Sequence, residues 1–291
     1  GVQTCALPIL IERSSCNGIT YVIYIPDTFL NDGPLPLLTL FRANPDEWFQ
    51  SRQDESRGRR NIFHIITDLI HKGWLEPCAF LFPSTCSYHQ SDFFFADDVY
   101  FPQFLSSTEP YLTKNRFENE LLPELQAKYQ LDISRVSLDG FSLGGFTSLS
   151  YSLLSPGRYV STGSFDGALL EFEYDNRVLT PLTPSDLTFD SFPYIFGDNP
   201  DEVLFRSKNP ADLVRSGTKV SRLHIMYSAD SGPASNRPRV ENFLEVLNIA
   251  GVENHVKNPL ISEHSSHQWY WVDEYLYLAL PFHTQCLNSV S

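Results

Sequence analysis

The feature that most constrains the fold of this chain is the segment G-F-S-L-G-G at residues 140–145. It fits the pattern G-x-S-x-G, which occurs once in the sequence. A short strand-like run at residues 135–138 precedes it, and an apolar helical segment at 144–154 follows. Side chains two residues either side of Ser142 would collide with each other and with an approaching ligand, so glycine is required there. The pattern predicts a tight strand-to-helix turn with Ser142 at its tip.

Strand and helix patterns alternate along the rest of the chain. Apolar runs, or runs rich in β-branched and aromatic residues, predict strands at residues 20–25, 35–41, 78–82 and 223–227. Further strands are expected at 159–164 and, as an edge strand, near His255. Apolar residues at helical spacing predict helices at 61–71, 115–129, 239–250 and 269–282. This alternation predicts an α/β fold with a mostly parallel central sheet and helices on both faces.

The two irregular segments of the chain are interpreted separately. Residues 1–9 resemble a translated sequencing adapter rather than native protein, so we expect a single domain over residues 10–291. The native N-terminus would then be missing, which leaves the compartment unknown, with the cytoplasm as the default. Residues 168–216 are interrupted by prolines and lack strong periodicity, which is typical of a lid or substrate-binding insert.

The charge balance and the cysteines restrict the partners. The formal net charge is −14, from 35 acidic and 21 basic side chains, and this charge repels nucleic-acid phosphates and anionic lipids. The sequence contains no run of 18 or more apolar residues, so it predicts no membrane span. The five cysteines lack zinc-like spacing, and no histidine or carboxylate cluster predicts a metal. We therefore expect a small-molecule substrate and no cofactor, and the oligomeric state stays open.

A serine at such a turn becomes a nucleophile only with a base, and the base needs a carboxylate that orients it. His267 lies directly before the last predicted helix and is favoured as the base over His264, with His255 a bystander. Asp230 follows the strand at 223–227 and is the favoured acid. Glu241 and Glu263 are the alternatives.

An oxyanion that forms on an attacked carbonyl needs backbone N–H donors. One is expected from Leu143, which directly follows Ser142 at the positive end of the next helix. The second is expected from the loop Arg42-Ala43-Asn44 after the strand at 35–41, and Ala43 is the named candidate.

Over residues 19–283 the chain resembles the esterase family of α/β-hydrolases that includes esterase D, enterochelin esterases, feruloyl esterases and the antigen 85 mycolyltransferases. The segments that carry the resemblance are L-F-R-A-N-P-D-E-W at 40–48, F-E-N-E-L-L-P at 117–123, G-F-S-L-G-G at 140–145, S-F-D-G-A at 164–168 and H-Q-W-Y-W at 267–271. The resemblance implies the α/β-hydrolase fold, with Ser142 as nucleophile and His267 as base, while Asp230 corresponds less closely to the acid.

The chain departs from the family at the oxyanion loop, where most members carry His-Gly and this chain carries Arg42-Ala43. Alanine adopts positive φ only at a cost, so the donor geometry there is expected to differ. Four residues are candidates for the substrate pocket: Arg42, Trp48, Asp166 and Trp269. Plain core packing is the alternative interpretation for the two tryptophans.

These observations together predict a serine carboxylic ester hydrolase that acts through an acyl-enzyme. Two alternatives stay open. An acyltransferase would use the same three residues with an alcohol in place of water, and a catalytically inactive binding protein could keep the same fold. The sequence does not choose the ester.

Overall fold

The computed structural model describes residues 9–30, 32–42, 45–50, 54–84, 114–169, 202–231 and 235–290. Within them lies a seven-stranded sheet in the order β1-β2-β4-β3-β5-β6-β7. The strands are β1 (Ile9–Cys16), β2 (Ile19–Pro26), β3 (Leu37–Phe41), β4 (Ala79–Pro83), β5 (Val136–Gly140), β6 (Ser161–Phe165) and β7 (Arg222–Met226). The first two strands pair antiparallel, β2 also pairs antiparallel with β4, and the other neighbours are parallel.

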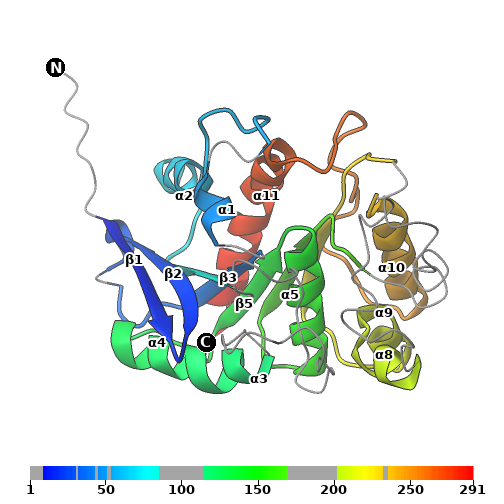
Figure 1. Ribbon diagram of the computed structural model, residues 1–291, viewed down its shortest axis with the longest axis horizontal. Helices are drawn as coiled ribbons and strands as arrows, with labels where there is room; N and C mark the ends of the chain where they lie inside the picture. Colours follow the sequence, from blue (N-terminus) through cyan, green and yellow to red (C-terminus); the bar gives the residue numbers. More distant parts are fainter. Residues whose placement is uncertain are drawn as a thin grey trace.

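Two layers of helices cover the sheet (Figure 1). The α-helices are α1 (Asp46–Phe49), α2 (Ile62–His71), α3 (Lys114–Arg116), α4 (Leu122–Tyr129), α5 (Leu143–Leu154), α8 (Glu202–Lys208), α9 (Pro210–Arg215), α10 (Arg237–Ile249) and α11 (Trp269–Asn288). Consecutive residues of β6 point to opposite faces, since Ser161 contacts His283 of α11 whereas Thr162 contacts Ser152 of α5. The helices α11 and α5 therefore cover opposite faces.

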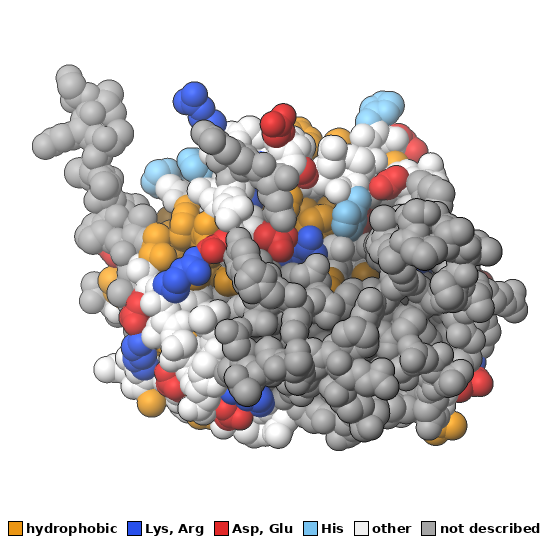
Figure 2. Space-filling model, in the orientation of Figure 1, with side chains coloured by type: hydrophobic (Ala, Val, Ile, Leu, Met, Phe, Trp, Pro, Cys, Tyr) orange, Lys and Arg blue, Asp and Glu red, His pale blue; other side chains and the backbone are white. Residues whose placement is uncertain are grey.

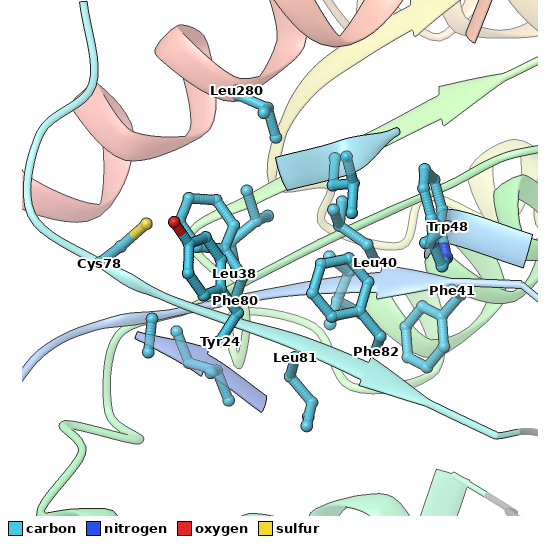
Figure 3. Packing of buried hydrophobic residues seen from close by; sticks show 14 of the residues in the cluster. Tyr24, Leu38, Leu40, Phe41, Trp48, Cys78, Phe80, Leu81, Phe82 and Leu280 are labelled. Atoms are coloured by element: carbon cyan, nitrogen blue, oxygen red, sulfur yellow. The ribbon is translucent and has the colours of Figure 1, made fainter. Parts of the chain in front are cut away.

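Every residue of β3, β4, β5 and β6 is buried, as expected for strands covered on both sides. Figure 3 shows how aromatic and aliphatic side chains of β3 and β4 pack against Trp48 of α1 and Leu280 of α11. The strands β4, β3, β5, β6 and β7 run parallel to their neighbours in this part of the sheet. Their carboxyl ends consequently meet at one edge of the sheet, and α5 begins there.

Three differences from the sequence analysis concern the ends and the insert. The strand β1 was not predicted, and it pairs with β2 from Ile9, inside the segment set aside as adapter-like. No strand forms near His255, where only isolated bridges join Asn254 and Leu260 to the region of β7. The end of the proline-rich insert is helical in α8 and α9, whereas residues 170–201 lie outside the described residues.

Candidate active site

The turn between β5 and α5 holds Ser142 in a strained conformation. Its φ of 57° and ψ of −115° lie outside the regions that L-residues favour. A Cβ on Gly140 would overlap the backbone of Gly144, and a Cβ on Gly144 would overlap the carbonyl of Phe41. The Ser142 N–H donates to the Phe165 carbonyl at 2.9 Å, which ties the turn to the end of β6. The glycines of the motif therefore serve the purpose that its pattern predicts.

The imidazole of His267 joins Ser142 to a carboxylate. Its Nε2 lies 3.1 Å from Ser142 Oγ, and its Nδ1 lies 3.2 Å from Asp166 Oδ2. The His267 side chain is 32% exposed, whereas that of Asp166 is 2% exposed. The ring of Phe141 lies 4.5 Å from the imidazole, centroid to centroid, and limits its movement. A hydroxyl, an imidazole and a buried carboxylate thus form one continuous chain of contacts.

Backbone contacts fix the carboxylate of Asp166. Its Oδ1 accepts a hydrogen bond from the Ser228 N–H at 2.7 Å, which leaves Oδ2 to face the imidazole. Its own N–H donates to the Met226 carbonyl at the end of β7, and its carbonyl accepts from Asn236 Nδ2 at 3.0 Å. Asp166 adopts a φ of 45°, a conformation uncommon for a residue other than glycine. These contacts hold one carboxylate oxygen in a fixed direction.

Two further residues border the turn. Leu143 is the first residue of α5, and a helix leaves its first N–H groups without intrahelical acceptors, with the positive end of its dipole beside them. Arg42 directly follows β3, and its Nε donates to Glu47 Oε2 at 2.6 Å while its guanidinium lies 5.1 Å from the ring centroid of Phe141. The turn of Ser142 is thus bordered by the start of α5 and by the end of β3.

A search against protein families adds evidence independent of this geometry. The family model described as "Putative esterase" matches residues 17–277 of the chain. The chain belongs to this esterase family. It is an enzyme of the esterase class, and the family acts on small ester substrates.

Solved structures of other esterases share the fold. A ferulic acid esterase aligns with a TM-score of 0.66 at 16% identity, covering 96% of this esterase and 98% of its own chain. An S-formylglutathione hydrolase from Agrobacterium tumefaciens gives 0.62 at 17% identity, with 97% and 100% covered. The enterobactin esterase of Shigella flexneri gives 0.60 at 14% identity, covering 98% of this chain and 61% of its own. These alignments confirm the predicted α/β-hydrolase fold.

The acid expected from the sequence was Asp230, and the structure brings Asp166 to His267 instead. Asp230 lies four residues beyond the end of β7, where its carbonyl accepts a hydrogen bond from the Ser235 hydroxyl. Asp166 directly follows β6, the strand next to β5, so it starts closer to the turn of Ser142. Asp166, which the sequence analysis gives as a candidate for the substrate pocket, contacts the imidazole of His267 in the structure.

The two tryptophans expected in the substrate pocket are core residues of this esterase. Trp48 is 1% exposed and Trp269 is 3% exposed. Their rings pack against each other at 5.1 Å, and Trp269 also contacts Phe141 at 5.3 Å. Trp269 thereby supports Phe141, whose ring packs against the imidazole of His267. Core packing is the alternative interpretation of these tryptophans in the sequence analysis, and their burial supports it.

The remaining candidates lie apart from the contact chain or outside the described residues. His264 is exposed, and the His255 ring packs on Phe282. Glu241, one alternative acid, pairs with Arg237 on α10. Ala43, the expected second oxyanion donor, lies outside the described residues.

The surroundings of the site carry no metal-like cluster within the described ranges. No group of three or more histidine, cysteine, aspartate or glutamate side chains there could hold a metal ion. No helix in the described part of the chain is long and apolar enough to cross a membrane. On the face shown in Figure 2, described acidic and basic side chains are interspersed.

Proposed function

We propose that the chain hydrolyses carboxylic esters through an acyl-enzyme formed on Ser142. The observation that carries this proposal is the contact chain from Ser142 Oγ through the His267 imidazole to Asp166 Oδ2. When Nδ1–H donates to the carboxylate, Nε2 is free to accept the hydroxyl proton. Ser142 then attacks the ester carbonyl carbon while His267 takes its proton.

The acyl-enzyme forms and decays in two balanced steps. In the first, the bond from Ser142 Oγ to the carbonyl carbon forms, the bond to the alcohol oxygen breaks, and His267 returns its proton to the leaving alkoxide. In the second, His267 takes a proton from water, the bond from the hydroxide oxygen to the acyl carbon forms, the bond from that carbon to Ser142 Oγ breaks, and His267 returns the proton to Oγ as the acid leaves. The Asp166 carboxylate stabilises the imidazolium that exists in both steps.

The tetrahedral intermediate in each step carries a negative charge on the former carbonyl oxygen. We assign the Leu143 N–H as one donor to this oxygen, because it follows the nucleophile and begins α5. We assign the second donor to the segment that follows Arg42, because β3 is parallel to β5 and the two strands end at the same edge of the sheet.

The test is hydrolysis of short-chain p-nitrophenyl esters by the wild type, Ser142→Ala and His267→Ala. We expect wild-type turnover that falls by ~10³-fold or more in both variants. Labelling by a fluorophosphonate, read by intact mass, should add one adduct to the wild type and none to Ser142→Ala. A folded wild type that neither turns over these esters nor takes the label would contradict the proposal.

The substrate is best sought with a panel, because the structural neighbours carry names of different substrates. Feruloyl esters, S-formylglutathione and enterobactin represent the neighbours named above. A kcat/KM for one member that exceeds that for p-nitrophenyl acetate by ~10²-fold or more would identify the acyl group or carrier that the pocket recognises. Label without turnover on the whole panel would indicate an intact nucleophile with another ester as substrate.

A further inference from the structure

The helix α11 begins two residues after His267, and a distant segment of the chain caps its N-terminus. The N-cap residue Gln268 makes no side-chain capping hydrogen bond. Instead the Trp269 N–H donates to Asp54 Oδ2 at 2.7 Å, and the Tyr270 N–H donates to Ser56 Oγ at 3.0 Å. Free N–H groups at a helix start need such acceptors. Asp54 precedes Trp269 by 215 positions, so this cap is a tertiary contact.

The two capping side chains are themselves held together. Asp54 Oδ1 accepts from the Ser56 N–H at 3.1 Å and from the Ser56 hydroxyl at 2.6 Å. The hydroxyl of Ser56 therefore donates to Asp54 while it accepts from Tyr270. Each carboxylate oxygen of Asp54 has its own donor, and the charge complements the positive end of the helix dipole.

Arg57 connects this turn to α11 and to the backbone of residues 47–50. Its Nε lies 3.0 Å from both carboxylate oxygens of Asp273 on α11, and its other nitrogens reach Asp273 and the carbonyls of Glu47, Trp48 and Gln50. The guanidinium also lies 4.7 Å from the ring centroid of Trp269. The Arg57 side chain is 1% exposed and that of Asp273 is fully buried, so the pair is fixed in the interior. Figure 1 shows α1, α2 and α11 together on this side of the sheet.

We propose that Asp54, Ser56 and Arg57, here called the clamp, position His267 for proton transfer. The inference rests on the proposed role of His267 as the base. His267 lies on a loop with an imidazole that is 32% exposed, and the loop ends where the clamp fixes Trp269. Movement of the helix start would change the 3.1 Å contact between Nε2 and Ser142 Oγ. A displacement of ~1 Å in a reacting group can cost ~10²-fold in rate.

The clamp residues are positioning residues, because they contact no reacting atom and act through Trp269 and Tyr270. Asp54 and Ser56 are only half-buried, so their substitution is tolerable for the fold, whereas Arg57 is buried. The proposal predicts that loss of the cap lowers kcat and kcat/KM together and leaves KM nearly unchanged.

The experiment compares Asp54→Ala, Asp54→Asn, Ser56→Ala and Ser56→Thr in the full chain, with the exposed Arg59→Ala as matched control. We expect Asp54→Ala and Ser56→Ala to lose ~10-fold or more in kcat with p-nitrophenyl acetate. Asparagine keeps one of the two acceptor oxygens and should restore part of the rate, and threonine keeps the hydroxyl and should restore most. Arg59→Ala should match the wild type. Wild-type kcat in a folded Asp54→Ala and Ser56→Ala would overturn the inference.

A second readout separates this inference from the proposed function. The ¹⁵N resonances of the His267 imidazole should shift in Asp54→Ala and stay unchanged in Arg59→Ala, whether or not the protein turns over esters. If the wild type hydrolyses esters, and Asp54→Ala changes neither kcat nor the imidazole resonances, the clamp inference is wrong and the esterase proposal stands. A wild type that neither turns over esters nor takes the fluorophosphonate label, but whose imidazole resonances respond to Asp54→Ala, would sink the esterase mechanism and still show that the clamp positions the His267 ring.

Discussion

The Nδ1 atom of His267 lies 3.2 Å from Oδ2 of Asp166, so the carboxylate beside the imidazole comes from the end of β6 rather than from the loop after β7. The backbone of the loop after β7 nevertheless takes part. The Ser228 N–H, two residues beyond β7, holds the other oxygen of the same carboxylate. The loop after β7 thus contributes an N–H donor where the sequence predicted a carboxylate.

We predict that Asp166→Asn lowers kcat by ~10³-fold to 10⁴-fold, because an amide cannot hold the Nδ1–H tautomer or stabilise the imidazolium. The matched variant Asp230→Asn should stay within ~10-fold of the wild type. Both are measured with p-nitrophenyl acetate at one pH. Full loss in Asp230→Asn with an active Asp166→Asn would assign the acid to Asp230 instead.

How much of the site the sequence could reveal depends on whether the signal is local. The turn of Ser142 is local, because its glycines satisfy steric demands within five residues, and the structure shows that geometry. His267 precedes a helix that its own periodicity reveals. The contact between His267 and Asp166 is long-range, and an aspartate follows both β6 and β7. Only the strand order and the backbone at Ser228 distinguish the two carboxylates.

The same reasoning explains the differences in the fold. The inner strands β3 and β4 were predicted because they are buried on both faces and form mostly apolar runs. The strand β1 is an edge strand with exposed, polar positions such as Arg13 and Ser15, so it lacks that run. The tryptophans are ambiguous in sequence, since large aromatics suit both pocket and core. Arg57 belongs to no sequence motif, and its buried contacts with Asp273 are visible only in the structure.

Beneath the turn of Ser142, the buried carboxylate of Asp139 is expected to contribute strongly to stability. It accepts hydrogen bonds from the Tyr275 hydroxyl at 2.8 Å and from His283 Nε2 at 3.0 Å. Burial and the adjacent carboxylate raise the pKa of Tyr275 well above its usual value, so its hydroxyl stays protonated and donates. Asp139→Ala should lower the free energy of unfolding by about 1–3 kcal/mol, because it leaves the buried His283 Nε2 without its acceptor.

Urea unfolding measures this loss, with Asp68→Ala as the control. Asp68 forms a surface ion pair with Lys72 on α2, and screening makes such pairs weak. The control should therefore unfold at nearly the wild-type urea concentration. An Asp139→Ala protein that unfolds together with the control would show that the buried carboxylate contributes little.

The close approach of α5 to β3 predicts the effect of a single methyl group. In Gly144→Ala the new Cβ would overlap the carbonyl of Phe41, which is backbone and cannot rotate away. We expect a loss of about 1–3 kcal/mol in unfolding free energy and a strong fall in esterase activity, since the turn of Ser142 must shift.

The control for this change is Ser150→Ala in the same helix. The Ser150 hydroxyl is buried and has no hydrogen-bond partner in the described part of the chain, so its removal should leave stability unchanged or slightly higher. Thermal unfolding and p-nitrophenyl acetate turnover are measured for both variants. Wild-type behaviour of Gly144→Ala would mean that β3 and α5 separate freely at this point.

The buried histidine of β7 predicts that acid destabilises the fold. Burial, with smaller contributions from His283 and His255, lowers the pKa of His224 to about 3 from the usual 6.5. Its Nδ1 is buried and has no hydrogen-bond partner within the described residues. As the pH falls below 6.5 the unfolded chain binds a proton at this position, whereas the folded chain does so only near pH 3. The stability contributed by the neutral ring is therefore complete above pH 6.5 and is lost between pH 6.5 and about 3.

Urea unfolding at pH 7.5 and 5.0 measures this dependence. His224 alone should account for about 2 kcal/mol of the loss between these two values, because each pH unit below 6.5 is worth about 1.4 kcal/mol. His224→Leu keeps an apolar side chain of similar volume in the strand, so its stability should fall by about 2 kcal/mol less than that of the wild type over the same interval. The exposed His71→Leu should keep the wild-type dependence. If His224→Leu and His71→Leu respond equally to acid, the protons that destabilise the fold bind elsewhere.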